Sequence, residues 1–158
     1  MKKLTTESAA RFSAEAKELP RLRTHELWHK DRSEQVQRFM IALQPGSYVR
    51  PHKHPSEVEW EALVAIQGRC KVFVFDDDGR LEDVSVLSPQ GPEFIVELDV
   101  DRWHSLMPLD EDTVIFEFKP GPMPSAEFAE WAPPEGDESV KEFLNALQNA
   151  EVGDVLVH

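Results

Sequence analysis

Short β-rich segments separated by turn residues make up the chain from residue 36 to about residue 118. These segments are VQRFMIAL, SYVRPHKH, EWEALVAI, CKVFVF, LEDVSVL, EFIVEL, WHSLM and TVIFEF. Turn residues lie between them, and the pair Asp78-Gly79 is a strong signal for a β-hairpin. Many short strands with little helix between them are typical of an antiparallel sandwich or a small barrel. We therefore predict an all-β fold.

Helical patterns flank the β-rich region. In residues 6–19, apolar side chains recur at near-helical spacing, and Pro20 follows them. Residues 21–30 fit neither a helix nor a strand clearly, and the proline-rich residues 120–136 are expected to be extended. Asp137 could then cap a second helix, whose apolar stripe would consist of Val140, Phe143, Leu144 and Leu147.

The chain length is that of a single domain with three parts. Residues 1–35 would form the N-terminal helix and a connecting segment, and residues 36–120 would form the barrel. Residues 121–158 would form the extended segment and the C-terminal helix, packed on the barrel.

The chain is strongly acidic, with a formal net charge of −13 over 158 residues. Such a charge repels phosphate backbones, which argues against nucleic-acid binding. The apolar runs are far shorter than the ~20 residues of a membrane span, and the N-terminus lacks the apolar core of a secretory signal. Cys70 is the only cysteine, so it cannot form an internal disulfide, and we expect it to be a buried structural thiol. These features predict a cytoplasmic protein without nucleic-acid or membrane partners.

Three histidines and a glutamate are spaced for a mononuclear metal site. His52 and His54 lie two residues apart in a predicted strand, where alternate side chains point to the same face. A turn and a second strand can bring Glu61 back to that face, and His104 can supply a third imidazole from a distant strand. Three nitrogens and one oxygen suit zinc or another divalent first-row metal, with room left for water or a ligand. We predict one divalent ion per chain, with zinc, iron, manganese, nickel and cobalt as candidates.

The same residues resemble the motifs of the cupin superfamily. Gly-x5-His-x-His at residues 46–54 and Glu-x6-Gly at residues 61–68 resemble its first motif, and His104 takes the place of the histidine in its second motif. More narrowly, residues 21–121 are similar to the WbuC-type cupin-fold metalloproteins, in the segments QRFMIAL, PGSYVRPHKHP, WEALVAIQG, VFVFDDDGR, WHSL and FEFKPGP. The resemblance implies a double-stranded β-helix, or jelly-roll barrel, with the ion inside one open end. It also implies that the ligands are His52, His54, Glu61 and His104.

The carboxylate ligand has two rivals in this chain. More residues separate Glu61 from His54 than in the general cupin motif, so Glu57 and Glu59 remain alternatives. We prefer Glu61 because it keeps the Glu-x6-Gly spacing.

Tyr48 and Arg50 have the same strand parity as the two neighbouring histidines. In a regular strand, all four side chains would therefore point into one cavity. The planar fork of an arginine suits bidentate binding of a carboxylate or phosphate, and Tyr48 could take part in proton transfer. We predict a small anionic ligand or substrate, with Tyr48 and Arg50 as catalytic residues. Alternatively, Arg50 pairs with an acidic residue of the protein itself.

The segment EWEALVAI is apolar on both faces. One face can line the barrel, but the other needs a terminal helix, a second sheet or a partner chain to cover it. We take this as support for a homodimer.

The resemblance implies a role in surface polysaccharide biosynthesis of the O-antigen type. We hypothesise a metal-dependent enzyme of isomerase or epimerase type that acts on a small anionic sugar-derived metabolite. The same ligands would also support an iron(II)-dependent dioxygenase. A third alternative is a non-catalytic cupin that carries a metal and binds or senses a small molecule.

Overall fold

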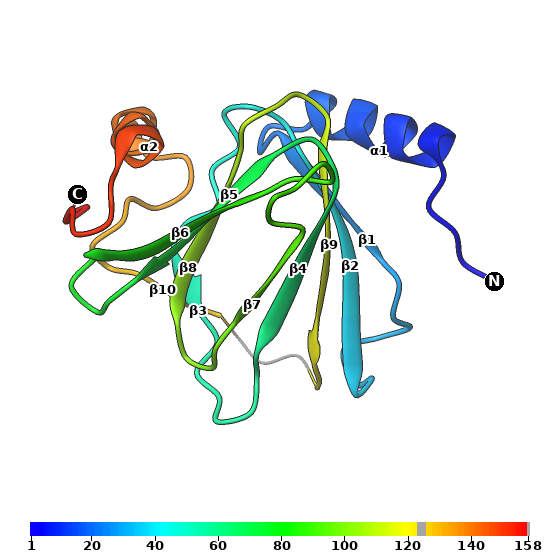
Figure 1. Cartoon of the computed structure of the whole chain (residues 1–158), viewed down its shortest axis with the longest axis horizontal. Helices are drawn as coiled ribbons and strands as arrows, with labels where there is room; N and C mark the ends of the chain where they lie inside the picture. Colours follow the sequence, from blue (N-terminus) through cyan, green and yellow to red (C-terminus); the bar gives the residue numbers. More distant parts are fainter. Residues whose placement is uncertain (123–125, 158) are drawn as a thin grey trace.

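Two five-stranded antiparallel sheets face each other in a computed structural model, which describes residues 1–122 and 126–157 (Figure 1). The first sheet contains, in spatial order, β1 (Arg23–Leu27), β2 (Val36–Leu43), β9 (Thr113–Pro120), β4 (Glu61–Gln67) and β7 (Ile95–Leu98). The second contains β10 (Glu127–Phe128), β3 (His52–Lys53), β8 (Trp103–Pro108), β5 (Cys70–Phe75) and β6 (Leu81–Leu87). Two helices, α1 (Thr6–Glu18) and α2 (Val140–Asn149), complete the fold. The predicted all-β fold with two flanking helices is confirmed.

The main hydrophobic core lies between the two sheets. Its buried residues come from the inner faces of both sheets and include Phe39, Ile41, Leu63, Val72, Leu106 and Ile115. Cys70 belongs to this core, as expected, and burial raises the pKa of its thiol to about 12. The inner faces are apolar over most of their length, so the charged side chains at one end are exceptional.

The two helices cover opposite outer faces of the sandwich (Figure 1). Helix α1 begins with a capping box between Thr5 and Ser8, and its buried Phe12 and Ala16 pack on the first sheet. Helix α2 packs its buried Phe143 and Leu147 on the outer face of the second sheet. The apolar spacing therefore predicted both helices correctly.

The N-cap of α2 differs from the prediction. The structure places Ser139 at this position, and Asp137 lies two residues earlier, where its carboxylate accepts a hydrogen bond from the Ser139 backbone N–H at 2.9 Å. Aspartate and serine are both favoured at helix N-caps, so the sequence indicated that a helix begins here but not which of the two residues is its N-cap.

The segment SYVRPHKH is only partly a strand. Regular pairing with neighbouring strands begins at His52, because the backbone groups before it are bonded elsewhere or lack a donor. The Tyr48 carbonyl accepts from Arg23, the Val49 carbonyl accepts from Ser105, and Pro51 has no N–H to donate. Without a regular strand, the alternation of side chains does not extend from His52 back to Tyr48.

Gly68 ends β4 in a conformation that favours glycine. Its φ is +68°, and a Cβ at this position would lie 2.6 Å from Thr113 Oγ1 and 3.0 Å from Thr113 Cα. The turn can therefore pass close to β9 only with glycine, which explains the glycine of the Glu-x6-Gly spacing.

Part of the first sheet has no cover within the described residues. Val64 and Ile95 are cross-strand neighbours on the outer face of β4 and β7, and Ile95 is 54% exposed. The apolar outer face of EWEALVAI is thus only partly buried, and the homodimer stays a prediction. Among the described residues, no helix has the length and apolar character needed to cross a membrane.

Candidate metal centre

His52 and His104 lie directly opposite each other on β3 and β8, with ring centroids 4.3 Å apart. Each ring hydrogen-bonds through Nδ1 to the backbone carbonyl two residues earlier, at 3.0 Å for His52 and 2.9 Å for His104. A carbonyl oxygen only accepts hydrogen bonds, so Nδ1 carries the proton in both rings. This leaves each Nε2 available for a ligand, as in many metal-binding histidines.

Glu61 reaches the histidines from the facing sheet. One carboxylate oxygen lies 2.9 Å from His54 Nε2, and the other lies 3.0 Å from His104 Nε2. Ring nitrogens of the three histidines all lie within 4.8 Å of one another. Two ligands that bind one ion at about 2.1 Å, at right angles, are themselves about 3 Å apart. The spacing of these atoms therefore fits a single metal ion.

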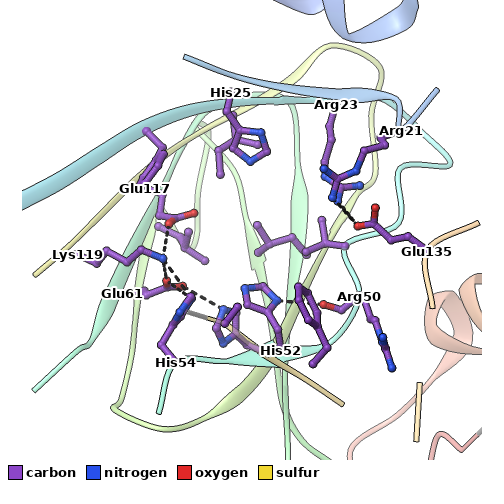
Figure 2. A pocket seen from close by; sticks show the side chains of 18 of the residues that line it. Arg21, Arg23, His25, Arg50, His52, His54, Glu61, Glu117, Lys119 and Glu135 are labelled. Atoms are coloured by element: carbon purple, nitrogen blue, oxygen red, sulfur yellow. Dashed lines mark hydrogen bonds and ion pairs between the residues drawn. The ribbon is translucent and has the colours of Figure 1, made fainter. Parts of the chain in front are cut away.

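A lysine and a second glutamate from β9 complete the cluster (Figure 2). The buried Lys119 ammonium contacts the Glu61 carboxylate, and it lies 3.1 Å from Glu117 Oε1 and 3.2 Å from His54 Nε2. Burial alone would lower the pKa of Lys119, but the carboxylates of Glu117 and Glu61 outweigh it and raise this pKa. The lysine is thus a permanent positive charge inside the site.

The other groups respond to burial and to one another. Burial raises the pKa of Glu117, and the nearby Glu61 carboxylate raises it further. Burial would also raise the pKa of Glu61, but the histidines and the Lys119 ammonium hold it well below its usual value. The pKa of His52 is lowered by burial and by His104, so this ring is neutral and free to coordinate at pH 7.

Glu59 lies beside the cluster on the other side of His54. Its carboxylate is buried, 4.0 Å from His54 Nδ1, and within the described residues neither Glu59 Oε1 nor His54 Nδ1 has a hydrogen-bond partner. Glu59 therefore remains a possible ligand or a hydrogen-bond partner that orients His54. The other rival to Glu61, Glu57, is exposed at the surface.

The buried charges of this cluster do not balance. Glu59, Glu61 and Glu117 carry three negative charges when ionised, and Lys119 supplies one positive charge. With all three carboxylates ionised and the histidines neutral, two negative charges remain in a region where unpaired charges are costly. One divalent cation would neutralise them, so the donor set and its charge both fit a bound metal ion.

The structure does not bring Tyr48 to this cluster. Its hydroxyl donates a hydrogen bond to the Pro133 carbonyl at 2.9 Å, and its ring packs against Phe143 of α2, on the outer face of the second sheet. Arg50 lines the cavity, but its guanidinium donates to the Ala129 carbonyl at 2.7 Å and points away from the histidines (Figure 2). The irregular backbone before His52 accounts for both orientations.

The cluster lines one end of a cavity of about 450 Å³ between the sheets. Apolar residues of both sheets form its middle, including Phe39, Ile41, Leu63 and Leu106. His25 of β1 also faces this cavity, and burial, together with Arg23, lowers its pKa to about 4. A volume of this size is typical of small-molecule sites.

Several cavity residues were not predicted from the sequence. Lys119 and Glu117 had a visible signal, because two charged residues at i and i+2 in the apolar run TVIFEFKP must share one face of a strand. Arg23 and His25 had none, since the strand that carries them was not recognised. Glu135 lies in a segment without periodic structure, so only the folded chain places it in the cavity.

Comparison with known families and structures gives the fold and one family match. A family model described as a domain of unknown function (DUF6016) matches residues 4–87, which is more than half of the chain. A comparison with curated proteins gave no match.

Similar solved structures include a cupin-2 domain and two oxalate enzymes. Oxalate oxidase in complex with the substrate analogue glycolate aligns with a TM-score of 0.56 and 17% identity, over 71% of this chain and 57% of that one. A cupin-2 domain from Rhodospirillum rubrum aligns with a TM-score of 0.52 and 17% identity, over 79% of each chain. The formate complex of oxalate decarboxylase from Lactobacillus farciminis gives a TM-score of 0.52 and 17% identity over 66% of this chain, which spans only 31% of that enzyme. These similarities show that the chain has the cupin fold.

Proposed function

This chain belongs to the family described as a domain of unknown function (DUF6016), and we propose that it is a metal-binding cupin that holds a small anionic ligand. His52, His54, His104 and Glu61 would bind one divalent ion. Glu59 is the alternative carboxylate. The ion and the open side of the cavity would together receive the ligand.

One observation supports this proposal most strongly. Three imidazoles and a carboxylate from both sheets converge on a point where three carboxylates in all face a single lysine. A merely structural cluster would be expected to balance its own charges.

Two observations support an anionic ligand. The far side of the cavity is lined by arginines, although the protein as a whole is strongly acidic. Two structures with the same fold, an oxalate oxidase and an oxalate decarboxylase, hold the small acids glycolate and formate.

The chemistry of such a site follows from its parts. A bound divalent ion would act as a Lewis acid towards an oxygen of the ligand. The backbone carbonyls of Arg50 and Arg102 orient the imidazoles of His52 and His104. Lys119 contacts the Glu61 carboxylate, and the apolar middle of the cavity would exclude water from the ligand.

We further propose that the chain is an enzyme of isomerase or epimerase type, acting on a sugar-derived acid in surface polysaccharide biosynthesis. The support for this substrate and pathway is the resemblance of the sequence to WbuC-type cupins.

Metal content tests the proposal directly. Protein purified without added metal should contain about one equivalent of a divalent ion per chain, measured by elemental analysis. After chelation, titration with zinc should show an affinity that falls at least about tenfold in His104→Gln and in His52→Gln.

His25→Gln is the matched control. His25 is a histidine that lines the same cavity but lies outside the metal cluster, so its loss should leave zinc affinity unchanged. Equal zinc affinity in the wild type and His104→Gln, with both proteins folded by circular dichroism, would contradict the proposed site.

A further inference from the structure

The cavity has a negatively charged end and a positively charged end. Glu61, Glu117 and the histidines form the first end, with Lys119 between the two carboxylates. The second end is lined by three arginines, namely Arg21, Arg23 and Arg50. In Figure 2, Arg21, Arg23, Arg50 and Glu135 lie on the opposite side from Glu117, Lys119 and Glu61.

Two of these arginines already bind a carboxylate. Glu135 accepts from Arg21 Nη2 at 2.6 Å and also contacts Arg23 Nη2, through the same oxygen. The Arg23 side chain is only 6% exposed, and its other terminal nitrogen donates to the Tyr48 carbonyl at 2.7 Å. A buried guanidinium fixed in this way is preorganised for a carboxylate oxygen.

Glu135 occupies a boundary between two hollows. It lines the cavity of the histidine cluster, and it also lines a neighbouring surface hollow of about 590 Å³, together with Arg21 and Arg23. The next residue, Gly136, has a φ of +86°, and nothing lies within 4 Å of the position that a Cβ would take. This loop therefore has free space around it, in contrast to the buried arginine that it covers.

The balance of charge also leaves room for a further anion. Glu135 is the acidic residue at this end of the cavity, where Arg21 and Arg23 contact it and Arg50 lines the same hollow. Guanidinium groups that outnumber the carboxylate beside them attract a second anion or exchange the first for another.

We propose that Arg21 and Arg23 form a second subsite for a carboxylate of the ligand, and that Glu135 occupies this subsite in the ligand-free protein. The ligand would then be a small acid with two acidic groups, one directed to the histidine cluster and the other to the arginine pair. This rests on the proposed function for the first group only. Displaced Glu135 would turn outwards into the neighbouring hollow.

Charge-removing variants at exposed positions test the subsite. Glu135→Gln removes the competing carboxylate, so succinate and malonate should bind about tenfold more tightly than to the wild type. Arg21→Gln removes one donor and should weaken the binding of both diacids by about the same factor. Acetate, which has a single acidic group for the cluster end, should change little in either variant. The affinities are measured by calorimetry on the metal-loaded protein.

Glu138→Gln is the control for Glu135→Gln. It removes the same charge from the same exposed loop, and within the described residues Glu138 forms no ion pair with either arginine. Its diacid affinity should match that of the wild type. If Glu135→Gln leaves diacid affinity unchanged, or if Arg21→Gln weakens acetate and succinate equally, the contact is a structural ion pair and the subsite is refuted.

A metal-free arm separates this proposal from the proposed function. The same titrations with chelated protein should still show tighter succinate binding to Glu135→Gln than to the wild type, because the arginine pair is independent of the ion. That result, in a protein that retains no metal on purification, would keep the arginine subsite and refute the metal site. Equal succinate affinity in Glu135→Gln and the wild type, in a protein that does retain a divalent ion, would refute the subsite and leave the metal site standing.

Discussion

The ammonium group of Lys119 touches two of the groups that would bind the ion, the Glu61 carboxylate and His54 Nε2. A divalent cation at this place would repel the ammonium, since both are buried and poorly screened. Glu117, 3.1 Å away, offers the lysine a second carboxylate when Glu61 turns to the ion. Lys119 would therefore act as an internal competitor that sets how tightly the proposed ion is held.

Lys119→Met should raise zinc affinity by about tenfold or more, because it removes the competing charge and keeps a side chain of similar length. The measurement is competition with a chelator of known affinity. Lys71→Met is the control, since Lys71 donates to the Gln148 carbonyl on the far side of the second sheet. Unchanged or weaker zinc affinity in Lys119→Met would mean that the lysine serves to hold Glu61 as a ligand.

Residue spacing predicted which side chains of the cluster meet, but not what surrounds them. His52, His54, His104 and Glu61 come together as the motif spacing indicated. Their neighbour Lys119 is close to them only because β9 pairs with β4, and no local sequence pattern predicts the register of this pairing. Strand parity predicted that Tyr48 would face the cavity, but the chain before His52 is not a regular strand. The Tyr48 hydroxyl therefore bonds to the Pro133 carbonyl, away from the cluster.

At the scale of elements, the sequence predicted the exact bounds of three strands. Each of them is a largely apolar run with turn residues at both ends. The runs VQRFMIAL, CKVFVF and LEDVSVL coincide with β2, β5 and β6. The missed strands β1 and β10 are edge strands, exposed along most of their length, with charged and aromatic residues in mixed order. Edge strands bury little apolar surface, so they leave a weak pattern in the sequence.

Helix α2 gives a test of the single-domain prediction. Leu147 is fully buried against the second sheet, so Leu147→Ala should lower the free energy of unfolding by about 2–5 kcal/mol, measured by urea denaturation. Asn145→Ala, on the exposed face of the same helix, should change it by less than about 0.5 kcal/mol. A similar small effect for both variants, or a second unfolding transition, would mean that α2 is not part of the cooperative unit.

At the scale of the whole molecule, the proposed ion would join the two sheets. His52 and His104 belong to one sheet and Glu61 to the other, and they come from distant parts of the sequence. An ion that binds only the folded arrangement adds its binding free energy to the stability of the fold. The stability of the domain should therefore follow the conditions that favour metal binding.

Zinc at one hundred times its dissociation constant should raise the melting temperature by about 5–10 °C at pH 7.5. This increment should shrink as pH falls below about 6, because coordinating histidines must be neutral and protons then compete with the ion.

His104 shows most clearly why the zinc-dependent increment in stability should rise with pH. Burial alone would lower the pKa of His104, but the Glu61 carboxylate raises it. In the ion-free protein, the pair of protonated His104 and ionised Glu61 therefore stabilises the fold at low pH. This stabilisation is lost as pH rises through the raised pKa of His104. The advantage of the ion must therefore grow with pH. Differential scanning calorimetry from pH 5 to 8 measures it, and a zinc-dependent increment that is constant with pH, or that persists in His104→Gln, would contradict coordination by these imidazoles.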